Sequence, residues 1–142
     1  MISAGFTEVE TPILLNSSPE GAREFLVPTP LSSSSTSPSF YALQQSPQQS
    51  KQLLIASGAV PKYFQMARCF RDEGGRKDRQ PEFTQVDLEM AFADGQAVRD
   101  VVEAMVKRIW REVKGVELEA WFRVMPYEVA MDVVSNLSRV YR

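Results

Sequence analysis

The sequence contains no histidine, and this absence excludes several kinds of active site. Histidine is the usual general base near neutral pH, the central member of Ser-His-Asp triads and a common zinc ligand. Any chemistry that this chain performs must therefore rest on carboxylates, on Arg or Lys, or on an external metal ion.

Cysteine, long apolar runs and excess charge are scarce as well. The single cysteine, Cys69, excludes an internal disulfide and is typical of a reducing compartment, and a buried thiol is its simplest role. No uninterrupted apolar run approaches the ~20 residues of a membrane span, so we expect no membrane partner. Because the net charge is only −2, any contact with nucleic acid must come from a local patch.

Length and composition are those of a soluble globular domain. The 142 residues are 44% hydrophobic and 24% charged, and domains commonly hold about 100–150 residues, so we expect one folding unit or part of one. The first ten residues, MISAGFTEVE, lack the features of a signal or transit peptide. Either the chain stays where it is made or its true amino terminus is missing.

The first part of the chain predicts short strands. We expect an edge strand within 5–15, because Pro12 forces the residue before it into an extended conformation. Brief strands are expected at 25–30 and 40–43. The Ser-rich, low-complexity segment 31–39 between them is predicted to be a solvated loop.

A helix is predicted from about Pro47 to Ser57. Proline is tolerated in the first turn because the amide hydrogen that it lacks would have no partner there. Ser46 would be the N-cap, with Gln49 closing a capping box, and Gly58 would end the helix.

Two further helices are predicted in the second part of the chain. Valine, methionine and isoleucine recur at helical spacing between a cap at Asp94 and a stop at Gly115, which predicts an amphipathic helix that faces a core. We expect one more short helix within 125–134, ending in the unpatterned tail 135–142.

Two alternating segments, 61–73 and 83–93, predict antiparallel strands joined by a long charged connection. Both strands would present a polar face. On that face Arg71 and Glu73 would look across at polar residues of the second strand, namely Gln85, Asp87 and Glu89. The opposite, apolar face would carry Phe64, Met66, Phe70, Val86, Leu88, Met90 and Phe92.

Such a polar surface suits a ligand that carries both a phosphate and a cationic group. Arginine binds phosphate through its planar fork of donors, and carboxylates suit an ammonium group, an adenine amino group or Mg²⁺. A hairpin whose polar face is simply solvated explains the same pattern, so the alternation alone leaves both interpretations open.

Longer strings of residues carry a family resemblance. The string FRDE, followed by a loop and RQPEFTQVDLEM, resembles motif 2 of the class II aminoacyl-tRNA synthetases, in the form of the bacterial-type and mitochondrial aspartyl-tRNA synthetases. GFTEVETPIL is similar to the end of motif 1, SPEGAREFLVP to a mobile aspartate-covering loop and FYALQQSPQQSKQLL to the aspartate-recognition segment. Four segments in the right order make the resemblance specific, and it extends to about Met131.

The resemblance implies an α+β fold, an antiparallel sheet flanked by helices. Residues 1–142 would form the N-terminal half of the catalytic domain, with the end of motif 1 at about 5–15 and motif 2 at about 62–92. The family activates L-aspartate with ATP to aspartyl-adenylate and transfers it to tRNA(Asp) in protein biosynthesis. The implied cofactors are ATP and Mg²⁺, and the family is homodimeric.

The resemblance also implies roles for individual residues around ATP. Arg71 would be catalytic, gripping the α-phosphate and the aspartate carboxylate as charge develops. Glu73 would receive the adenine amino group, Phe83 would stack on the adenine ring, and Asp72 and Gln80 would also contact the nucleotide.

A second implied group of residues selects aspartate. Lys51 would pair with the side-chain carboxylate and Gln48 would lie beside it, while Glu20 and Asp87 would hold the ammonium group. Arg71 would contact the other carboxylate. The acceptor end of the tRNA would meet three basic residues of the charged connection, although a solvated loop explains them equally well: Arg76, Lys77 and Arg79.

Several parts of the family pattern are not found in this sequence. Motif 3, the acidic Mg²⁺ ligands and the anticodon-binding domain are missing, so we expect no metal site in this chain and an exposed apolar sheet face. Whether the isolated chain is an enzyme stays uncertain, and we expect it to be inactive. The alternatives are a non-catalytic module that binds nucleotide, tRNA or a partner, and an unrelated α+β domain. The expected location is the mitochondrial matrix, or otherwise bacterial cytoplasm.

Overall fold

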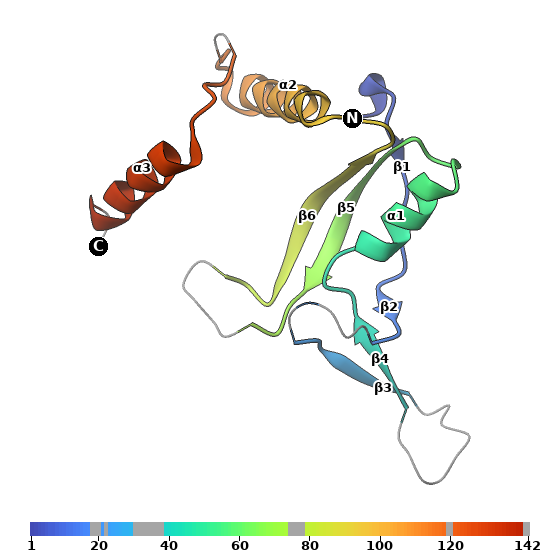
Figure 1. The fold of residues 1–142 in the computed structure, drawn as a ribbon. Coiled ribbons are helices and arrows are strands. Elements are labelled where there is room, and N and C mark those ends of the chain that lie inside the picture. The colour runs from blue at the N-terminus through green and yellow to red at the C-terminus, as the bar shows by residue number, and fades with distance from the viewer. Residues whose placement is uncertain (18–20, 22, 30–38, 74–78, 119–120, 141–142) are drawn as a thin grey trace. The chain divides into compact units, whose positions relative to one another are not determined.

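The computed structural model of the chain describes residues 1–17, 21, 23–29, 39–73, 79–118 and 121–140 (Figure 1). The chain divides into two compact units, Met1–Ala93 and Asp94–Arg142, rather than the single unit expected from its length. No helix in the described ranges has both the length and the apolar character needed to cross a membrane.

The first unit contains two three-stranded sheets. One sheet has the order β1-β5-β6, in which β1 runs parallel to β5 and β6 runs antiparallel to it; its strands are β1 (Thr7–Glu8), β5 (Lys62–Phe70) and β6 (Glu82–Met90). The other is antiparallel, with the order β2-β4-β3; its strands are β2 (Leu14–Leu15), β4 (Ser39–Leu43) and β3 (Leu26–Thr29). The expected hairpin and brief strands are confirmed, and the α+β class with them.

The single edge strand predicted within 5–15 is instead two strands, β1 and β2, in different sheets. The change of sheet occurs next to Pro12, where Thr11 is buried and its hydroxyl lies 2.9 Å from the side-chain amide of Gln65. A proline cannot donate to a ladder, and a buried hydroxyl needs a partner, so the chain leaves the first sheet at this point.

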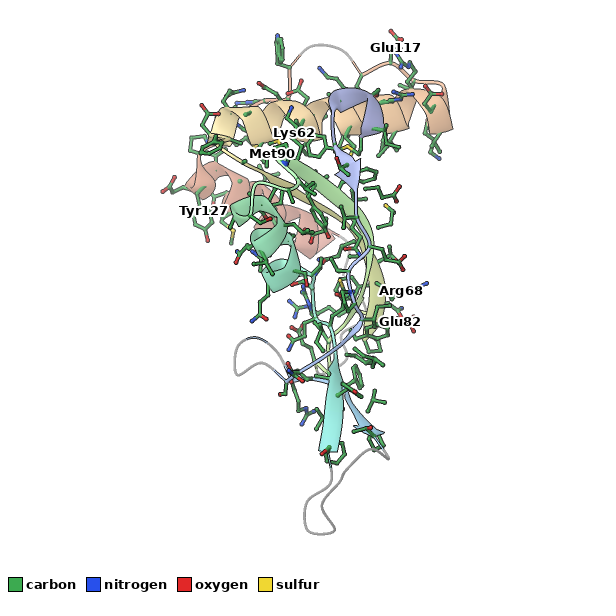
Figure 2. All side chains as sticks on the ribbon, turned by 90° about the vertical axis from the view of Figure 1, so that its right-hand side faces the viewer. Lys62, Arg68, Glu82, Met90, Glu117 and Tyr127 are labelled. Carbon is green, nitrogen blue, oxygen red and sulfur yellow. The ribbon has the colours of Figure 1, made fainter. Side chains whose placement is uncertain are left out.

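The register of the β5–β6 hairpin runs from the Lys62–Met90 pair to the Phe70–Glu82 pair, and Figure 2 labels residues near both ends. This register corrects one prediction. Arg71 and Glu73 lie beyond the end of β5, and the backbone N–H of Arg71 donates to the carbonyl of Pro81 (2.9 Å). Arg71 therefore faces the start of β6 rather than the residues predicted opposite it, Gln85, Asp87 and Glu89.

The polar face of the hairpin is the buried one, so of the two interpretations left open by the sequence the simply solvated face is excluded. Tyr63, Ala67 and Cys69 are completely buried, and Gln65 is 5% exposed. Helix α1 (Gln48–Ala56) packs on this side, against β5 and β6. On the other face, Met66 and Val86 are exposed, as expected for an uncovered apolar surface, and Arg68 pairs with Glu82 (3.2 Å; Figure 2).

The start of α1 differs from the predicted capping box. Pro47, and not Ser46, occupies the N-cap position, and no side chain caps the helix. The first helical bond runs from the N–H of Lys51 to the carbonyl of Pro47 (2.9 Å), so Ser46 lies one residue too early to serve as cap. At the other end Gly58 has φ +74° and donates its N–H to the carbonyl of Ile55, as a helix stop should.

The second unit contains α2 (Gly95–Lys114) and α3 (Tyr127–Val140). The predicted cap and stop of α2 are confirmed: the Asp94 carboxylate accepts from the N–H of Ala97 (2.8 Å), and Gly115 adopts the left-handed conformation. Within the second unit no residue of α2 is buried, and the core that its apolar stripe would face stays a prediction. The last helix is longer than expected, because it continues through most of the tail.

A basic residue connects α2 to the segment that follows it. The Lys107 ammonium lies 2.6 Å from the Glu103 carboxylate and 5.4 Å and 5.7 Å from the ring centres of Trp121 and Phe122. The hydrogen bond from Lys107 lowers the pKa of Glu103. This cluster holds the segment near residue 121 against the helix.

Candidate functional site

Arg71 and Phe83 lie together on the buried side of the hairpin. The guanidinium carbon of Arg71 is 5.1 Å from the centre of the Phe83 ring, and its Nε donates to the backbone carbonyl of Gln45 (3.3 Å). The ring belongs to β6, directly opposite Cys69 of β5. An arginine held by a carbonyl and an aromatic face still has its two terminal nitrogens available as donors to an anion.

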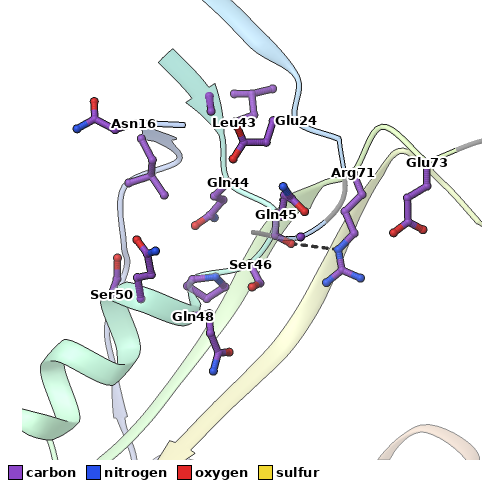
Figure 3. Close-up of a pocket in the computed structure, with 15 residues that line it drawn as sticks. Asn16, Glu24, Leu43, Gln44, Gln45, Ser46, Gln48, Ser50, Arg71 and Glu73 are labelled. Carbon is purple, nitrogen blue, oxygen red and sulfur yellow. Dashed lines mark hydrogen bonds between the residues drawn. The ribbon is translucent and has the colours of Figure 1, made fainter. Parts of the chain in front are cut away.

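An open pocket of about 470 Å³ lies beside this arginine (Figure 3). Its lining includes Gln44, Gln45, Ser46, Gln48, Arg71 and Glu73. Gln44 is 3% exposed, and its amide nitrogen donates to the carbonyl of Arg68 (2.7 Å), but its oxygen is buried without a hydrogen-bond partner among the described residues. The pocket thus combines a cationic group with the buried amide of Gln44, a combination that suits a polar, anionic ligand.

Lys51 forms the centre of a buried ionic cluster. It projects from α1, is 7% exposed, and its Nζ lies 2.6 Å from Asp87 Oδ1 and 3.2 Å from Glu89 Oε2. The second carboxylate oxygen of Asp87 is buried and has no hydrogen-bond partner in the described part of the chain. The cluster has two negative charges and one positive charge, so it can accept a further cationic group.

The sequence prediction did not include Glu89 in the site. The signal was present in the alternation, because residues two apart on a strand share a face, and Glu89 follows Asp87 by two. What the sequence did not show was that the helix carrying Lys51 crosses this face of β6.

The remaining predicted nucleotide residues are engaged with arginines or exposed. Asp72 pairs with Arg23 (2.7 Å), and Glu73 pairs with Arg79 (2.7 Å). Gln80 is exposed near the start of β6. Three predicted residues lie outside the described residues: Glu20, Arg76 and Lys77. Gln48 is exposed at the pocket. The structure brings the four central residues of the predicted set together as two pairs, Lys51 with Asp87 and Arg71 with Phe83.

Neutral, buried groups lie beneath these charges. The Tyr63 hydroxyl hydrogen-bonds to the side chain of Gln65, and burial, reinforced by the negative charge of Asp87, raises the pKa of Tyr63. The Cys69 thiol donates to the side-chain oxygen of Gln85 (3.2 Å). Burial raises the pKa of Cys69; Arg71 opposes this shift and Asp87 adds to it.

We predict that Cys69 is unreactive in the folded chain. Thiolates are the reactive form, so a buried thiol with a raised pKa should be alkylated at least about a hundredfold more slowly near pH 8 than in concentrated urea. The fold favours the protonated thiol of Cys69. The thiol therefore contributes its full stabilisation at pH values below its pKa in the unfolded chain. That contribution is lost as pH rises toward the folded pKa.

Alkylation followed by mass spectrometry measures the rate, and urea denaturation at increasing pH measures the stability. In a Cys69→Ala variant, the free energy of unfolding should no longer show the decrease at alkaline pH that ionisation of the thiol causes. Equal alkylation rates with and without urea would contradict the buried position of the thiol.

The described residues contain no large cluster of metal-binding side chains. They contain no group of three or more cysteine, aspartate or glutamate side chains close enough to hold a metal ion. The two carboxylates that do converge, Asp87 and Glu89, are both bound to Lys51.

Comparison with known proteins identifies the family. The model of the class II tRNA synthetases (D, K and N) matches residues 1–140. The mitochondrial aspartate–tRNA ligase of Saccharomyces cerevisiae is 67% identical over 105 residues, which cover 74% of this chain and 16% of that enzyme. The aspartate–tRNA(Asp/Asn) ligases of Natranaerobius thermophilus and Thermotoga maritima are 56% and 54% identical over 128 residues, 90% of this chain and 21% of each enzyme.

The chain thus spans between 16% and 21% of the length of these three relatives. The family match covers both sheets, the three α-helices and all four central site residues. With its fold, its motif strings and its relatives in agreement, this chain belongs to the class II tRNA synthetases of the D, K and N group, and the relatives named here are aspartate–tRNA ligases.

Proposed function

We propose that this chain carries the aspartate-recognition and adenylate-forming part of an aspartate–tRNA ligase. The observation that carries the proposal is the arrangement on one face of β6. Phe83 and Asp87 lie four residues apart on β6 and point to the same side. Phe83 lies beside Arg71, and Asp87 is bound to Lys51. Four residues of strand span about 13 Å, which is room for an amino acid joined to a nucleotide.

The Lys51–Asp87 pair matches the charges of a bound amino acid. The side-chain carboxylate of the ligand would bind the Lys51 ammonium, and its α-ammonium would bind the Asp87 carboxylate. Each charge of the ion pair and of these two ligand groups would then have a partner of opposite sign. Asparagine brings an amide where Lys51 needs a carboxylate. The buried ammonium then loses one counter-charge and keeps only Glu89, so selection against asparagine should be strong.

Arg71 would serve the chemical step. The α-carboxylate of aspartate attacks the α-phosphorus of ATP, a new carbon-oxygen-phosphorus bridge forms, and pyrophosphate leaves. Negative charge on the α-phosphate is greatest as the old bond breaks, and a planar guanidinium can donate two parallel hydrogen bonds to it. Because Arg71 lies only 5.1 Å from the ring centre of Phe83, it must turn away from the ring before adenine can stack on that face.

The wider assignments rest on the family resemblance. Transfer to tRNA(Asp), a homodimer and a requirement for Mg²⁺ are proposed for the whole ligase and not for the described residues alone. The mitochondrial matrix is the proposed location, supported by the yeast mitochondrial relative, and a bacterial cytoplasm is the alternative because other relatives are bacterial.

The test separates binding from turnover. Calorimetric titration of the purified chain with a non-hydrolysable aspartyl-adenylate analogue should show saturable binding, while the asparaginyl analogue should bind at least about a hundredfold more weakly. Aspartate-dependent exchange of pyrophosphate into ATP should be weak or absent, because motif 3 of the family is not found in this sequence. Absence of any binding would refute the proposal, whereas robust exchange would refute the expected inactivity.

The alternative is a non-catalytic module that meets a partner through its uncovered sheet face. The observation in its favour is the exposure of Met66 (56%) and Val86 (43%), two apolar side chains in the middle of the hairpin. Binding of the adenylate analogue would favour the ligase assignment, and its absence in a folded chain would favour the module.

A further inference from the structure

Arg71 is followed directly in the sequence by two carboxylates, and each of them is paired with a different arginine. The Asp72 carboxylate lies 2.7 Å from Nε of Arg23, and the Glu73 carboxylate lies 2.7 Å from a terminal nitrogen of Arg79. Among the described residues Arg71 itself forms no ion pair, and its Nε donates to a backbone carbonyl (Figure 3). The guanidinium proposed to bind the ligand is thus not taken by the negative charges that follow it.

Two contacts hold Arg23 to Asp72. Besides the ion pair, the backbone N–H of Asp72 donates to the carbonyl of Arg23 (3.0 Å). The segment is also tied to β4, because the N–H of Leu43 donates to the carbonyl of Phe25 (2.9 Å). These backbone contacts place the guanidinium of Arg23 beside the carboxylate although its side chain is 77% exposed, so the pair is better fixed than an isolated surface ion pair.

An unpaired carboxylate at position 72 would compete with an anionic ligand for Arg71. Both residues lie beyond the end of β5, so the alternation of a strand does not hold their side chains on opposite faces. A long arginine side chain can turn to such a carboxylate, which accepts the same forked hydrogen bonds as a phosphate. The ligand would then have to break that ion pair before it could bind.

We propose that Arg23 is a positioning residue, which holds the Asp72 carboxylate and thereby leaves the Arg71 guanidinium available to an anionic ligand. The inference rests on the proposed function for the identity of that ligand, an adenylate whose phosphate Arg71 binds. Arg23 acts through Asp72 and does not touch the ligand. Asp72 is a partner of Arg23 and not the nucleotide contact that the family resemblance implied.

A double-mutant cycle tests the proposal by rescue. Arg23→Ala frees the Asp72 carboxylate, so the Kd of the non-hydrolysable aspartyl-adenylate analogue should rise about fivefold, the value of an exposed ion pair that the ligand must break. Asp72→Asn removes the competing charge and should change the Kd by less than about twofold. The double variant should bind as Asp72→Asn does, because Arg23 then has no charge to hold.

The cycle also identifies the other possible roles of the two residues. If Arg23 bound the ligand directly, the double variant would bind as weakly as Arg23→Ala. If Asp72 bound the nucleotide, Asp72→Asn alone would weaken binding at least as much as Arg23→Ala. Either result, or an unchanged Kd in Arg23→Ala, would overturn the proposal.

A matched control is the ion pair of Arg68 with Glu82 on the other face of the sheet, whose side chains are 53% and 56% exposed. Arg68→Ala, alone or together with Glu82→Gln, should leave the Kd of the analogue within about twofold of the original. A fivefold rise in Arg68→Ala would show that the loss of one positive charge explains the effect at Arg23, and the proposal would fail.

The Nε–H of Arg71 gives a test that needs no ligand. This group donates to the carbonyl of Gln45, and the guanidinium carbon lies 5.1 Å from the centre of the Phe83 ring, so its NMR signal reports where the guanidinium lies. In Arg23→Ala the signal should shift as Arg71 turns to Asp72, and the further change Asp72→Asn should return it.

This signal distinguishes failure of the inference from failure of the proposed function. An unmoved signal in folded Arg23→Ala would overturn the role of Arg23, whether or not the analogue binds. If the original chain binds no analogue but the signal shifts and returns as described, the proposed function fails and the role of Arg23 toward Arg71 stands.

Discussion

Replacing Lys51 with methionine lowers the free energy of unfolding by about 3 kcal/mol, because Asp87 and Glu89 then lie against α1 without a counter-charge. Methionine keeps most of the volume and the unbranched shape of the lysine stem, so loss of packing contributes little. The same change removes the group proposed to bind the side-chain carboxylate. Urea denaturation followed by circular dichroism measures the first effect, and titration with the aspartyl-adenylate analogue measures the second.

Lys62 is the matched control for this prediction. It lies at the start of β5, is exposed, and its ammonium is 5.7 Å from the centre of the Phe6 ring. Lys62→Met should cost less than about 1 kcal/mol, the value of an exposed cation–π contact. If Lys51→Met cost no more than Lys62→Met, the ion cluster would contribute nothing to stability beyond a surface lysine, and the assignment of a buried counter-ion network would be wrong.

Replacing Arg71 with alanine raises the Kd of the aspartyl-adenylate analogue by about a hundredfold or more, since two charge-assisted hydrogen bonds to the phosphate are lost. Arg71→Lys should give an intermediate loss, because lysine supplies a point charge without the planar donor fork. Stability should change little, because the one described hydrogen bond of this side chain, to Gln45, is long at 3.3 Å. Calorimetry measures the binding.

Arg68→Ala is the corresponding control. Arg68 belongs to β5, three residues before Arg71, and lies on the other face of the sheet, where it pairs with Glu82 at the surface. Binding of the analogue should stay within about twofold, since a surface ion pair contributes little and does not face the ligand. Equal losses in the two variants would indicate non-specific attraction of the anionic ligand rather than a specific contact by Arg71.

Local chemistry allowed much of the fold to be predicted. The period of two in the hairpin segments, the Asp94 cap and the Gly115 stop depend on residues close together in sequence, and the structure confirms all three. The placement of Arg71 beside Phe83 was implied by the family resemblance, and in the structure the guanidinium carbon lies 5.1 Å from the ring centre.

Long-range packing decided what the sequence could not show. Alternation separates two faces of a strand but does not say which one is covered, and here α1 covers the polar face. For the same reason Lys51, an ordinary surface lysine by its local sequence, is buried, and Glu89 joins its cluster. Arg71 does not face its predicted partners, Gln85, Asp87 and Glu89, because the pairing of the two strands begins at the Phe70–Glu82 pair, before Arg71 is reached.

The spacing of paired residues along the chain gives an expected order of folding. The widest pair of the β5–β6 ladder, Lys62 with Met90, closes a loop of 28 residues (90 − 62), whereas the Thr7–Tyr63 pair of β1 closes one of 56 (63 − 7). Closing shorter loops costs less entropy, so the hairpin should form first and β1 should join last. Arg71 and Phe83 would then be brought together early, before the amino-terminal strand is secured.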